Sequence, residues 1–262
     1  MKVLLVATVQ SHICQFHKPL VAMLHERGCE VHAAARKNLG EKNGLKLDFV
    51  ERVFDVPFQR SPFSPKNLEA YKQLKKIIGE GGYDVIHCNT PVGGVLGRLA
   101  ARKARKHGTK VFYTAHGFHF YKGAPKKNWL IWYPVEKFMC RYTDKLITIT
   151  QEDYDLASAK FPTQVERIHG VGANSAKYHK LTEAECLELR YELGYTEDDK
   201  LLLCTGELLP NKNQITAIRA MKTLINQQPK AKLLLAGNGP MLPELLAEVD
   251  TLNLQGYVEF LG

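Results

Sequence analysis

Apolar runs alternate with amphipathic stretches along the chain. Residues 2–8 form a continuous apolar run, as expected for a strand that is buried on both faces. Apolar residues then recur at helical spacing until Gly28, which ends the predicted helix. The same alternation predicts strands at residues 2–8, 30–34, 49–56, 84–88, 110–115 and 145–150, and again at 201–205, 232–236 and 257–261.

Helices are predicted between these strands. One begins at Ser64 and Pro65, where the serine is expected to cap the helix and the proline to take its first position. Another is expected to bend near Pro134. The predicted helices cover residues 64–79, 92–106, 126–141, 152–160, 182–193, 213–226 and 240–249.

This alternation predicts an α/β fold of two Rossmann-like, doubly wound parallel-sheet domains. We expect a first domain at residues 1–170, an inter-domain connection at 171–195 and a partial second domain at 196–262. The second set has only three predicted strands and two helices, so we expect the chain to be truncated there. Right-handed crossovers place every strand-to-helix loop at one sheet edge, where ligands bind in such folds.

The composition is that of a globular protein, with 262 residues, 45% of them hydrophobic and 24% charged. It excludes a disordered chain, a coiled coil and a collagen. No apolar run approaches the roughly 18–20 residues of a membrane-spanning helix, and no signal-peptide cleavage site follows the first strand. Six scattered cysteines without a C-x-x-C pair indicate reduced thiols and a cytoplasmic protein, not disulfides or zinc.

The positive charge is concentrated in one stretch. No acidic residue lies between Asp84 and Glu136, and the basic residues there equal the whole formal net charge of +9. Such a stretch attracts phosphate groups, and the aromatic residues Trp129, Trp132 and Tyr133 favour a membrane–water boundary. An anionic membrane surface and an ordinary solvated helix face both explain this pattern. No zinc finger, RNP-like or helix-turn-helix pattern supports nucleic acid. The basic residues are Arg98, Arg102, Lys103, Arg105, Lys106, Lys110, Lys122, Lys126 and Lys127.

Polar residues follow the first and fourth predicted strands. The loop at residues 9–12 lacks G-x-G-x-x-G, which argues against a dinucleotide-dependent oxidoreductase. A helix N-terminus after a strand can still hold an anion, and Ser11 and His12 would be further donors. Asn89 and Thr90 follow strand 84–88, where they either meet a ligand or cap the next helix.

Two histidines follow the strand at residues 110–115. His116 precedes a glycine at the strand tip and is well placed to meet a substrate. His119 lies in an aromatic segment and either meets the ligand or packs there. Asp153 and Asp155 form a D-x-D motif, which we interpret as acidic residues in the first turn of a helix rather than metal ligands. No metal site is predicted.

The second set of elements has two polar loops of its own. Lys212 lies at the predicted start of a helix, a poor place for a cation unless an anion is bound there. Asn211 or Asn213 is expected to cap that helix. The next loop is a glycine turn at residues 237–240, where a ligand can approach the backbone closely.

Five segments together resemble a known family. They are HICQFHKP at 12–19, TAHGFHFYKGAP at 114–125, KLITIT at 145–150, GELLPNKNQ at 206–214 and AGNGP at 236–240. In this order the chain resembles the retaining glycosyltransferases of the GT-B fold, family 4 (GT4). Within them it is most similar to the bacterial enzymes of capsule and exopolysaccharide assembly.

The resemblance implies that the first domain holds an acceptor and the second a nucleotide sugar, which is expected to be a UDP-sugar. His116 matches the family's histidine near the transferred sugar, and Lys212 the lysine that grips the donor diphosphate. The implied acceptor is a polyprenyl-diphosphate-linked saccharide at the inner face of the plasma membrane. Transfer would retain configuration without a protein nucleophile, a metal or a cofactor. The donor residues expected are Gly206, Glu207, Lys212, Asn213, Gly237, Asn238 and Gly239, and the acceptor residues Ser11, His12, Asn89, Thr90 and His119.

The chain departs from the family pattern in two places. Family members often carry arginine where this chain has Glu207, and a carboxylate would repel a phosphate. The family's E-x7-E motif, which orients the donor sugar, occurs nowhere in the chain. Two alternatives therefore stay open: a catalytically inactive fragment that binds a membrane surface or an acceptor, and a UDP-sugar epimerase or phosphorylase of the same fold.

Overall fold

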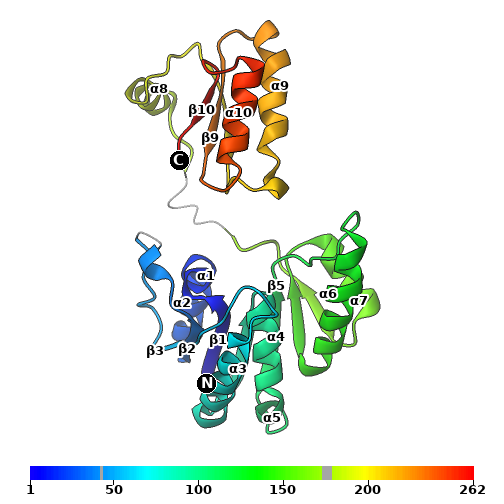
Figure 1. The fold of residues 1–262 in the computed structure, drawn as a ribbon. Coiled ribbons are helices and arrows are strands. Elements are labelled where there is room, and N and C mark those ends of the chain that lie inside the picture. The colour runs from blue at the N-terminus through cyan, green and yellow to red at the C-terminus, as the bar shows by residue number, and fades with distance from the viewer. Residues whose placement is uncertain (42–43, 173–178) are drawn as a thin grey trace. The chain divides into compact units, whose positions relative to one another are not determined.

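The computed structural model describes residues 1–41, 44–172 and 179–262. The chain falls into two compact units, Met1–Ala173 and Asn174–Gly262, each with its own sheet and core (Figure 1). The sequence instead places a connection over residues 171–195, of which residues 173–178 lie outside the described part of the chain.

The first unit is built on a seven-stranded sheet in the order β3-β2-β1-β4-β5-β6-β7. Every neighbouring pair is parallel, so the carboxyl ends of the strands lie at one edge. The strands are β1 (Lys2–Val9), β2 (Glu30–Arg36), β3 (Arg52–Asp55), β4 (Val85–Asn89), β5 (Lys110–Ala115), β6 (Lys145–Thr148) and β7 (Gln164–Arg167). The helices are α1 (Gln10–Phe16), α2 (Lys18–Glu26), α3 (Lys66–Gly81), α4 (Pro91–Ala100), α5 (Arg102–Arg105), α6 (Lys126–Met139) and α7 (Gln151–Lys160).

The strand β1 is buried on both faces, as its continuous apolar sequence predicts. Val3, Leu5 and Ala7 join one core cluster with residues of α1 and α2. Leu4 and Val6 point the other way and join a second cluster with residues of α3 and α4. Helices therefore cover both faces of the sheet, and the predicted α/β fold is confirmed.

The connection after β1 differs from the prediction. The helix α1 begins directly where β1 ends, so the loop expected at residues 9–12 is absent, and Ser11 and His12 lie in the first turn of α1. The single helix expected here is two helices, α1 and α2, which meet at His17. The break has a physical reason: Pro19 has no N–H to continue the bonding of α1 but is favourable in the first turn of α2.

The start of α3 also differs. Pro65 takes the cap position, and neither it nor Ser64 provides a side-chain cap. The buried Asn67 instead fixes the loop before the helix: its Oδ1 accepts the Gln59 N–H at 2.9 Å, and its Nδ2 donates to the Ser61 carbonyl at 2.9 Å. The strand β7 was not predicted, because its four residues show no continuous apolar run.

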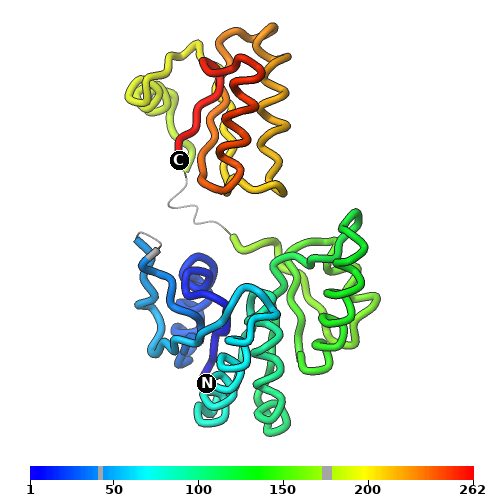
Figure 2. The backbone as a smooth tube through the Cα atoms, in the orientation of Figure 1, coloured from blue at the N-terminus to red at the C-terminus, as the bar shows by residue number. Residues whose placement is uncertain are grey.

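The basic stretch at residues 98–133 does not form one surface. The chain passes from α4 into α5 at Ala101 and reaches the amino end of β5, so residues 102–110 lie at the amino edge of the sheet (Figures 1 and 2). Residues 122–127 follow the carboxyl end of β5 and lie at the other edge. The helix α4 has ten residues and is therefore about 15 Å long. This length separates the basic residues at the amino edge from those at the carboxyl edge.

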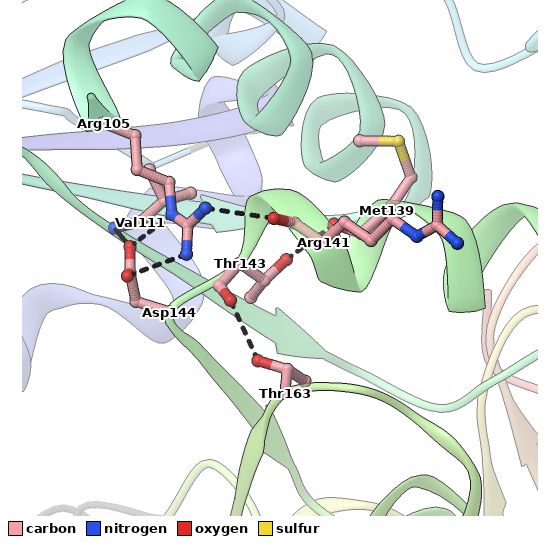
Figure 3. A network of polar contacts seen from close by, with 7 residues as sticks. All are labelled: Arg105, Val111, Met139, Arg141, Thr143, Asp144 and Thr163. Atoms are coloured by element: carbon pink, nitrogen blue, oxygen red, sulfur yellow. Dashed lines mark hydrogen bonds and ion pairs between the residues drawn. The ribbon is translucent and has the colours of Figure 1, made fainter.

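One of these basic residues anchors a strand. Arg105 donates to both carboxylate oxygens of Asp144, at 2.9 and 3.0 Å, and to the Arg141 carbonyl at 3.0 Å (Figure 3). Asp144 Oδ2 also accepts the Val111 N–H at 2.8 Å. Burial opposes ionisation of Asp144, but these bonds outweigh it and lower the pKa of the carboxyl. Arg105 is therefore a structural residue that fixes the start of β5.

A buried ion pair joins α4 to α6. Arg98 is fully buried, and its Nη2 donates to Glu136 Oε2 at 2.8 Å while its Nε donates to the Gly94 carbonyl at 2.9 Å. The guanidinium stacks on the ring of Tyr113 with its carbon 3.9 Å from the ring centroid. The Tyr113 hydroxyl lies 3.4 Å from Glu136 Oε1 as a donor, and burial raises its pKa well above the usual value. Two helices and β5 are thereby held in one arrangement.

The second unit has a three-stranded parallel sheet in the order β10-β9-β8, with a core formed against two helices. A further helix, α8, lies in the predicted connection but belongs to this unit; it begins with a capping box of Thr182 and Glu185. The elements are β8 (Lys200–Thr205), β9 (Ala231–Ala236), β10 (Val258–Phe260), α8 (Glu183–Glu192), α9 (Gln214–Gln227) and α10 (Leu242–Leu252).

Among the described residues, no helix is both long and apolar enough to cross a membrane.

We expect Arg98→Met to destabilise the first unit by about 3–5 kcal/mol, because it leaves the Glu136 carboxylate buried without its partner. The double variant Arg98→Met/Glu136→Leu should recover most of this loss. Urea unfolding followed by tryptophan fluorescence measures it, since both tryptophans lie in α6. The control is Lys145→Met, at the exposed pair with Glu166, which should cost about 1 kcal/mol or less. Equal losses in Arg98→Met and the control would contradict the assignment.

Candidate functional site

Two threonines join the carboxyl ends of β1 and β4. Thr90 Oγ1 accepts the Thr8 N–H at 2.9 Å and lies 2.7 Å from Thr8 Oγ1. Thr90 has φ 64° and ψ 153°, a conformation that β-branched residues rarely adopt and that costs on the order of 1–3 kcal/mol. Its side chain does not cap α4, so that interpretation of Thr90 is wrong. The threonine pair holds the strained residue at the sheet edge.

Four histidines gather at this edge, from α1, the α1–α2 junction, β4 and the end of β5. The ring centroids of His12 and His116 are 4.6 Å apart, those of His12 and His17 5.5 Å, and those of His17 and His87 5.8 Å. His116 Nε2 lies 3.3 Å from Asn89 Oδ1, within hydrogen-bond distance. The structure therefore brings together three residues that the sequence predicts in separate loops: His12, Asn89 and His116.

Burial keeps these imidazoles neutral. Burial is the larger cause and the neighbouring imidazoles the smaller one, and together they lower the pKa of His12 and His87 to about 3 and that of His116 to about 4. Burial lowers the pKa of His17 as well. At neutral pH the edge therefore presents neutral donors and acceptors, which suit sugar hydroxyls better than a phosphate.

Ser11 and Asn89 shape the edge without lining a cavity. Ser11 donates its N–H to Asn38 Oδ1 at 3.0 Å and accepts from Asn38 Nδ2 at 2.8 Å, and both residues are buried. Asn89 is fully buried and reaches a ligand only through His116. His12 Nε2, in contrast, is buried and has no hydrogen-bond partner among the described residues.

The start of α7 forms hydrogen bonds with the loop after β5, which carries the predicted site residues His116 and His119. Thr150 caps the helix by accepting the Asp153 N–H at 3.1 Å. Asp153 Oδ2 lies 3.4 Å from the Phe118 N–H, and Glu152 Oε1 accepts the Lys122 N–H at 2.6 Å. Asp153 lies in the first turn, as predicted, together with Glu152, and both also position residues 116–122. Asp155, the second residue of the D-x-D motif, lies beyond the first turn and accepts from Gln151 Nε2. No group of metal-ligating side chains is found in the part of the chain that is described.

A cavity of about 530 Å³ opens beside this edge. Its walls come from α4, α6, the loop before α3 and the loop after β5, and most of its lining is apolar or aromatic. Of the predicted acceptor residues, His12, Thr90 and His119 line it, whereas Ser11 and Asn89 do not. His116, expected near the transferred sugar, is not among the lining residues either. His119 is exposed, and its ring lies 5.3 Å from that of Trp132.

Sequence reasoning missed the two helix faces that line this cavity, and also Arg60, Phe63 and Glu136. One signal was available. Arg98 and Glu136 are charged residues that lie within mainly apolar helices, a pattern that favours a buried ion pair.

Two glycine loops meet in the second unit. The Gly206 N–H donates to the Ala236 carbonyl at 2.9 Å, and the Leu208 N–H donates to the Asn238 carbonyl at 3.0 Å. A Cβ on Gly237 would lie 2.0 Å from the Gly206 carbonyl oxygen, and one on Gly239 would lie 2.4 Å from that of Leu208. Only glycine fits at either position, so these loops pack backbone against backbone at the carboxyl ends of β8 and β9.

Lys212 lies in a short 3-10 turn just before α9. It is exposed and forms no ion pair with any described residue. The predicted asparagine cap is wrong: Asn213 takes the cap position with φ 55°, but its Oδ1 accepts from the Thr216 hydroxyl and not from a backbone N–H. Buried Gln214 holds the loop instead, by donating to the Glu207 carbonyl at 3.1 Å.

A chain of two units, each built on a parallel sheet packed against helices, is typical of the GT-B fold. Alr3699/HepE of Anabaena, solved with UDP and glucose, superposes with a TM-score of 0.73 at 20% identity over all of this chain and 69% of that one. A UDP-N-acetylglucosamine 2-epimerase superposes at 0.62 with 15% identity, over all of this chain and 68% of the other. At these identities the likeness shows the fold alone.

Two family models match the chain: Glycosyltransferase Family 4 at residues 19–171 and Glycosyl transferases group 1 at residues 187–262. The protein named as glycosyltransferase EpsD in Bacillus subtilis (strain 168) is 46% identical over the whole chain, which spans 68% of its length. An Escherichia coli UDP-Gal:alpha-D-GlcNAc-diphosphoundecaprenol alpha-1,3-galactosyltransferase is 27% identical over 82% of this chain and 57% of its own length. The chain belongs to glycosyltransferase family 4.

We expect the first unit to lose stability as the pH falls through the histidine range. The unfolded chain takes up a proton on His87 near pH 6.5, whereas folded His87 does so only near pH 3. Stability is therefore complete above pH 6.5 and falls as the pH drops toward 3. Between pH 7.5 and 5.5, His87 alone accounts for a loss of about 1 kcal/mol.

The check is urea unfolding of the parent and of His87→Gln at both pH values, followed by tryptophan fluorescence. The parent should lose about 1 kcal/mol more than the variant. An identical pH dependence in the two proteins would rule out a buried neutral His87.

Proposed function

We propose that the protein transfers a sugar from a UDP-sugar to a polyprenyl-diphosphate-linked saccharide with retention of configuration. The observation that carries the proposal is Lys212, an exposed cation that forms no ion pair within the described part of the chain, next to two loops whose close backbone packing only glycine permits. A diphosphate supplies the anion that this lysine lacks. The galactosyltransferase relative named above supports the substrate classes, since its name specifies UDP-Gal and a diphosphoundecaprenol acceptor.

The proposed roles follow from the two units. Lys212 and the loop N–H groups stabilise the leaving diphosphate, and Gly206, Asn213, Gly237, Asn238 and Gly239 belong to the loops that meet the donor. Glu207 contributes its backbone, since its carboxylate would repel the phosphates. His116, held by Asn89, and His12 present neutral imidazoles to the reacting sugars. Catalysis is then positioning and charge stabilisation, with no metal and no protein nucleophile.

The epimerase alternative rests on the fold likeness alone. UDP-N-acetylglucosamine 2-epimerases superpose on the chain at 12–15% identity. The family models and the curated relatives are glycosyltransferases, so we retain transfer as the function.

Calorimetric titration of this chain with UDP tests the donor half. Binding should be measurable and should weaken at least about tenfold in Lys212→Ala, which removes a charge contact to the phosphates. Lys222→Ala, an exposed lysine on α9 away from the loops, should bind as the parent does. If a chain that is folded by circular dichroism does not bind UDP, or binds it equally well without Lys212, the donor assignment is wrong.

We further propose that the amino-terminal end of α6, which lies at the carboxyl edge of the first sheet, docks on an anionic membrane. Lys122, Lys126 and Lys127 lie there beside Leu130 and Ile131, whose side chains are 79% and 44% exposed. Cationic and apolar side chains on one exposed surface favour the boundary of an anionic bilayer. The proposed location is the inner face of the plasma membrane.

Vesicle flotation tests this surface. The chain should float with phosphatidylglycerol vesicles at low salt, and Lys126→Glu/Lys127→Glu should abolish most of the binding, because it reverses two charges worth about 1 kcal/mol each. The matched control is Lys103→Glu/Lys106→Glu at the opposite sheet edge, which should float as the parent does. The proposal is wrong if the parent does not float, or if Lys126→Glu/Lys127→Glu floats as the parent does.

A further inference from the structure

The cavity of the first unit borders two different environments. On one side it reaches the sheet edge at Thr8, His12 and Thr90. On the other side its lining includes Phe63 and Ile131, whose side chains are 81% and 44% exposed. The cavity thus connects the histidine-lined edge with the apolar surface beside the lysines of α6.

The walls of the cavity fit a hydrocarbon chain. On α4, Val92, Val95 and Leu96 face it, and on α6 Trp132 and Val135 do so. Burying apolar area against such walls contributes about 25 cal/mol per Å². A volume of about 530 Å³ lies within the range of ligand pockets of roughly 300–1,000 Å³. One cavity of this size accommodates a single chain better than the paired chains of a diacyl lipid.

The polar groups at the cavity indicate what the chain carries. Arg60 lines it, is exposed, and forms no ion pair with any described residue. Glu136, the one carboxylate among the described residues that line the cavity, is already paired with Arg98 at 2.8 Å and so does not repel an anion at the Arg60 side. A hydrocarbon chain with an anionic head matches this combination.

From this geometry we infer that the cavity binds the first isoprene units of an isoprenyl diphosphate. The diphosphate lies toward Arg60, and the attached sugar lies toward His12 and Thr90. This inference rests on the proposed function, because it assigns the lipid part of the proposed acceptor to a site in the first unit. It also gives Trp132 and Val95 a role in binding that no sequence motif indicates.

The two tryptophans of the chain provide a direct readout. Trp132 lines the cavity and Trp129 does not. In a Trp129→Phe background, the emission of Trp132 should change saturably on titration with farnesyl diphosphate. The response to farnesol should need higher concentrations, because the alcohol has no anion for Arg60, and inorganic diphosphate should give no response.

Three variants in this background locate the ligand. Val95→Phe fills the cavity and should weaken farnesyl diphosphate binding about tenfold or more. Arg60→Ala, an exposed residue whose loss leaves the core intact, should bring farnesyl diphosphate down to the level of farnesol. Leu130→Phe is the control: it adds similar bulk on α6 outside the cavity and should change nothing.

The inference is overturned if Trp132 does not respond saturably to farnesyl diphosphate. It is also overturned if Val95→Phe, shown to be folded by circular dichroism, binds farnesyl diphosphate as the parent does. A third contradicting result is a saturable change of Trp132 emission with dioctanoylglycerol at the same affinity as with farnesyl diphosphate. The UDP titration at Lys212 is independent of this cavity. A chain that binds UDP but not farnesyl diphosphate therefore contradicts only this inference, and one that binds farnesyl diphosphate but not UDP contradicts only the donor assignment.

Discussion

The parallel order of the first sheet is the constraint on which the rest of the structure depends. Because neighbouring strands are parallel, the carboxyl ends of β1, β4 and β5 lie side by side at one edge. Thr8 meets Thr90, and Asn89 meets His116, across long stretches of sequence only for this reason. The contact of Thr90 with Thr8 then holds a backbone conformation that the residue would otherwise avoid.

The buried pair of Arg98 and Glu136 determines what lies beside that edge. It fixes α4 against α6 across the ring of Tyr113, and the apolar faces of these two helices form the cavity. A buried ion pair contributes little net stability compared with an apolar replacement, but it permits few alternative packings.

The alternation of apolar strands and amphipathic helices was enough to predict the α/β fold and the loops that carry polar residues, because β1 and β9 are buried and nearly uniform in polarity. The break at His17 was missed although Pro19 signals it in the sequence. The side chain of Asn213 could not be predicted, because its left-handed backbone conformation and its bond with Thr216 are not visible in the sequence pattern. The cavity also escaped prediction, because it depends on which helices become neighbours in space. The basic stretch is continuous in sequence but does not form one surface, because α4 carries the chain from one edge of the sheet to the other.

The central claim is that each unit binds a different substrate of one reaction. The second unit binds the diphosphate of the donor, and the first unit binds the lipid-linked acceptor. Hydrogen exchange of the chain with UDP alone and with farnesyl diphosphate alone tests it most directly. The account predicts protection of residues 206–214 and 237–240 by UDP, and of residues 91–96 and 131–136 by farnesyl diphosphate. Protection of the same unit by both ligands, or of neither unit by either ligand, would contradict it.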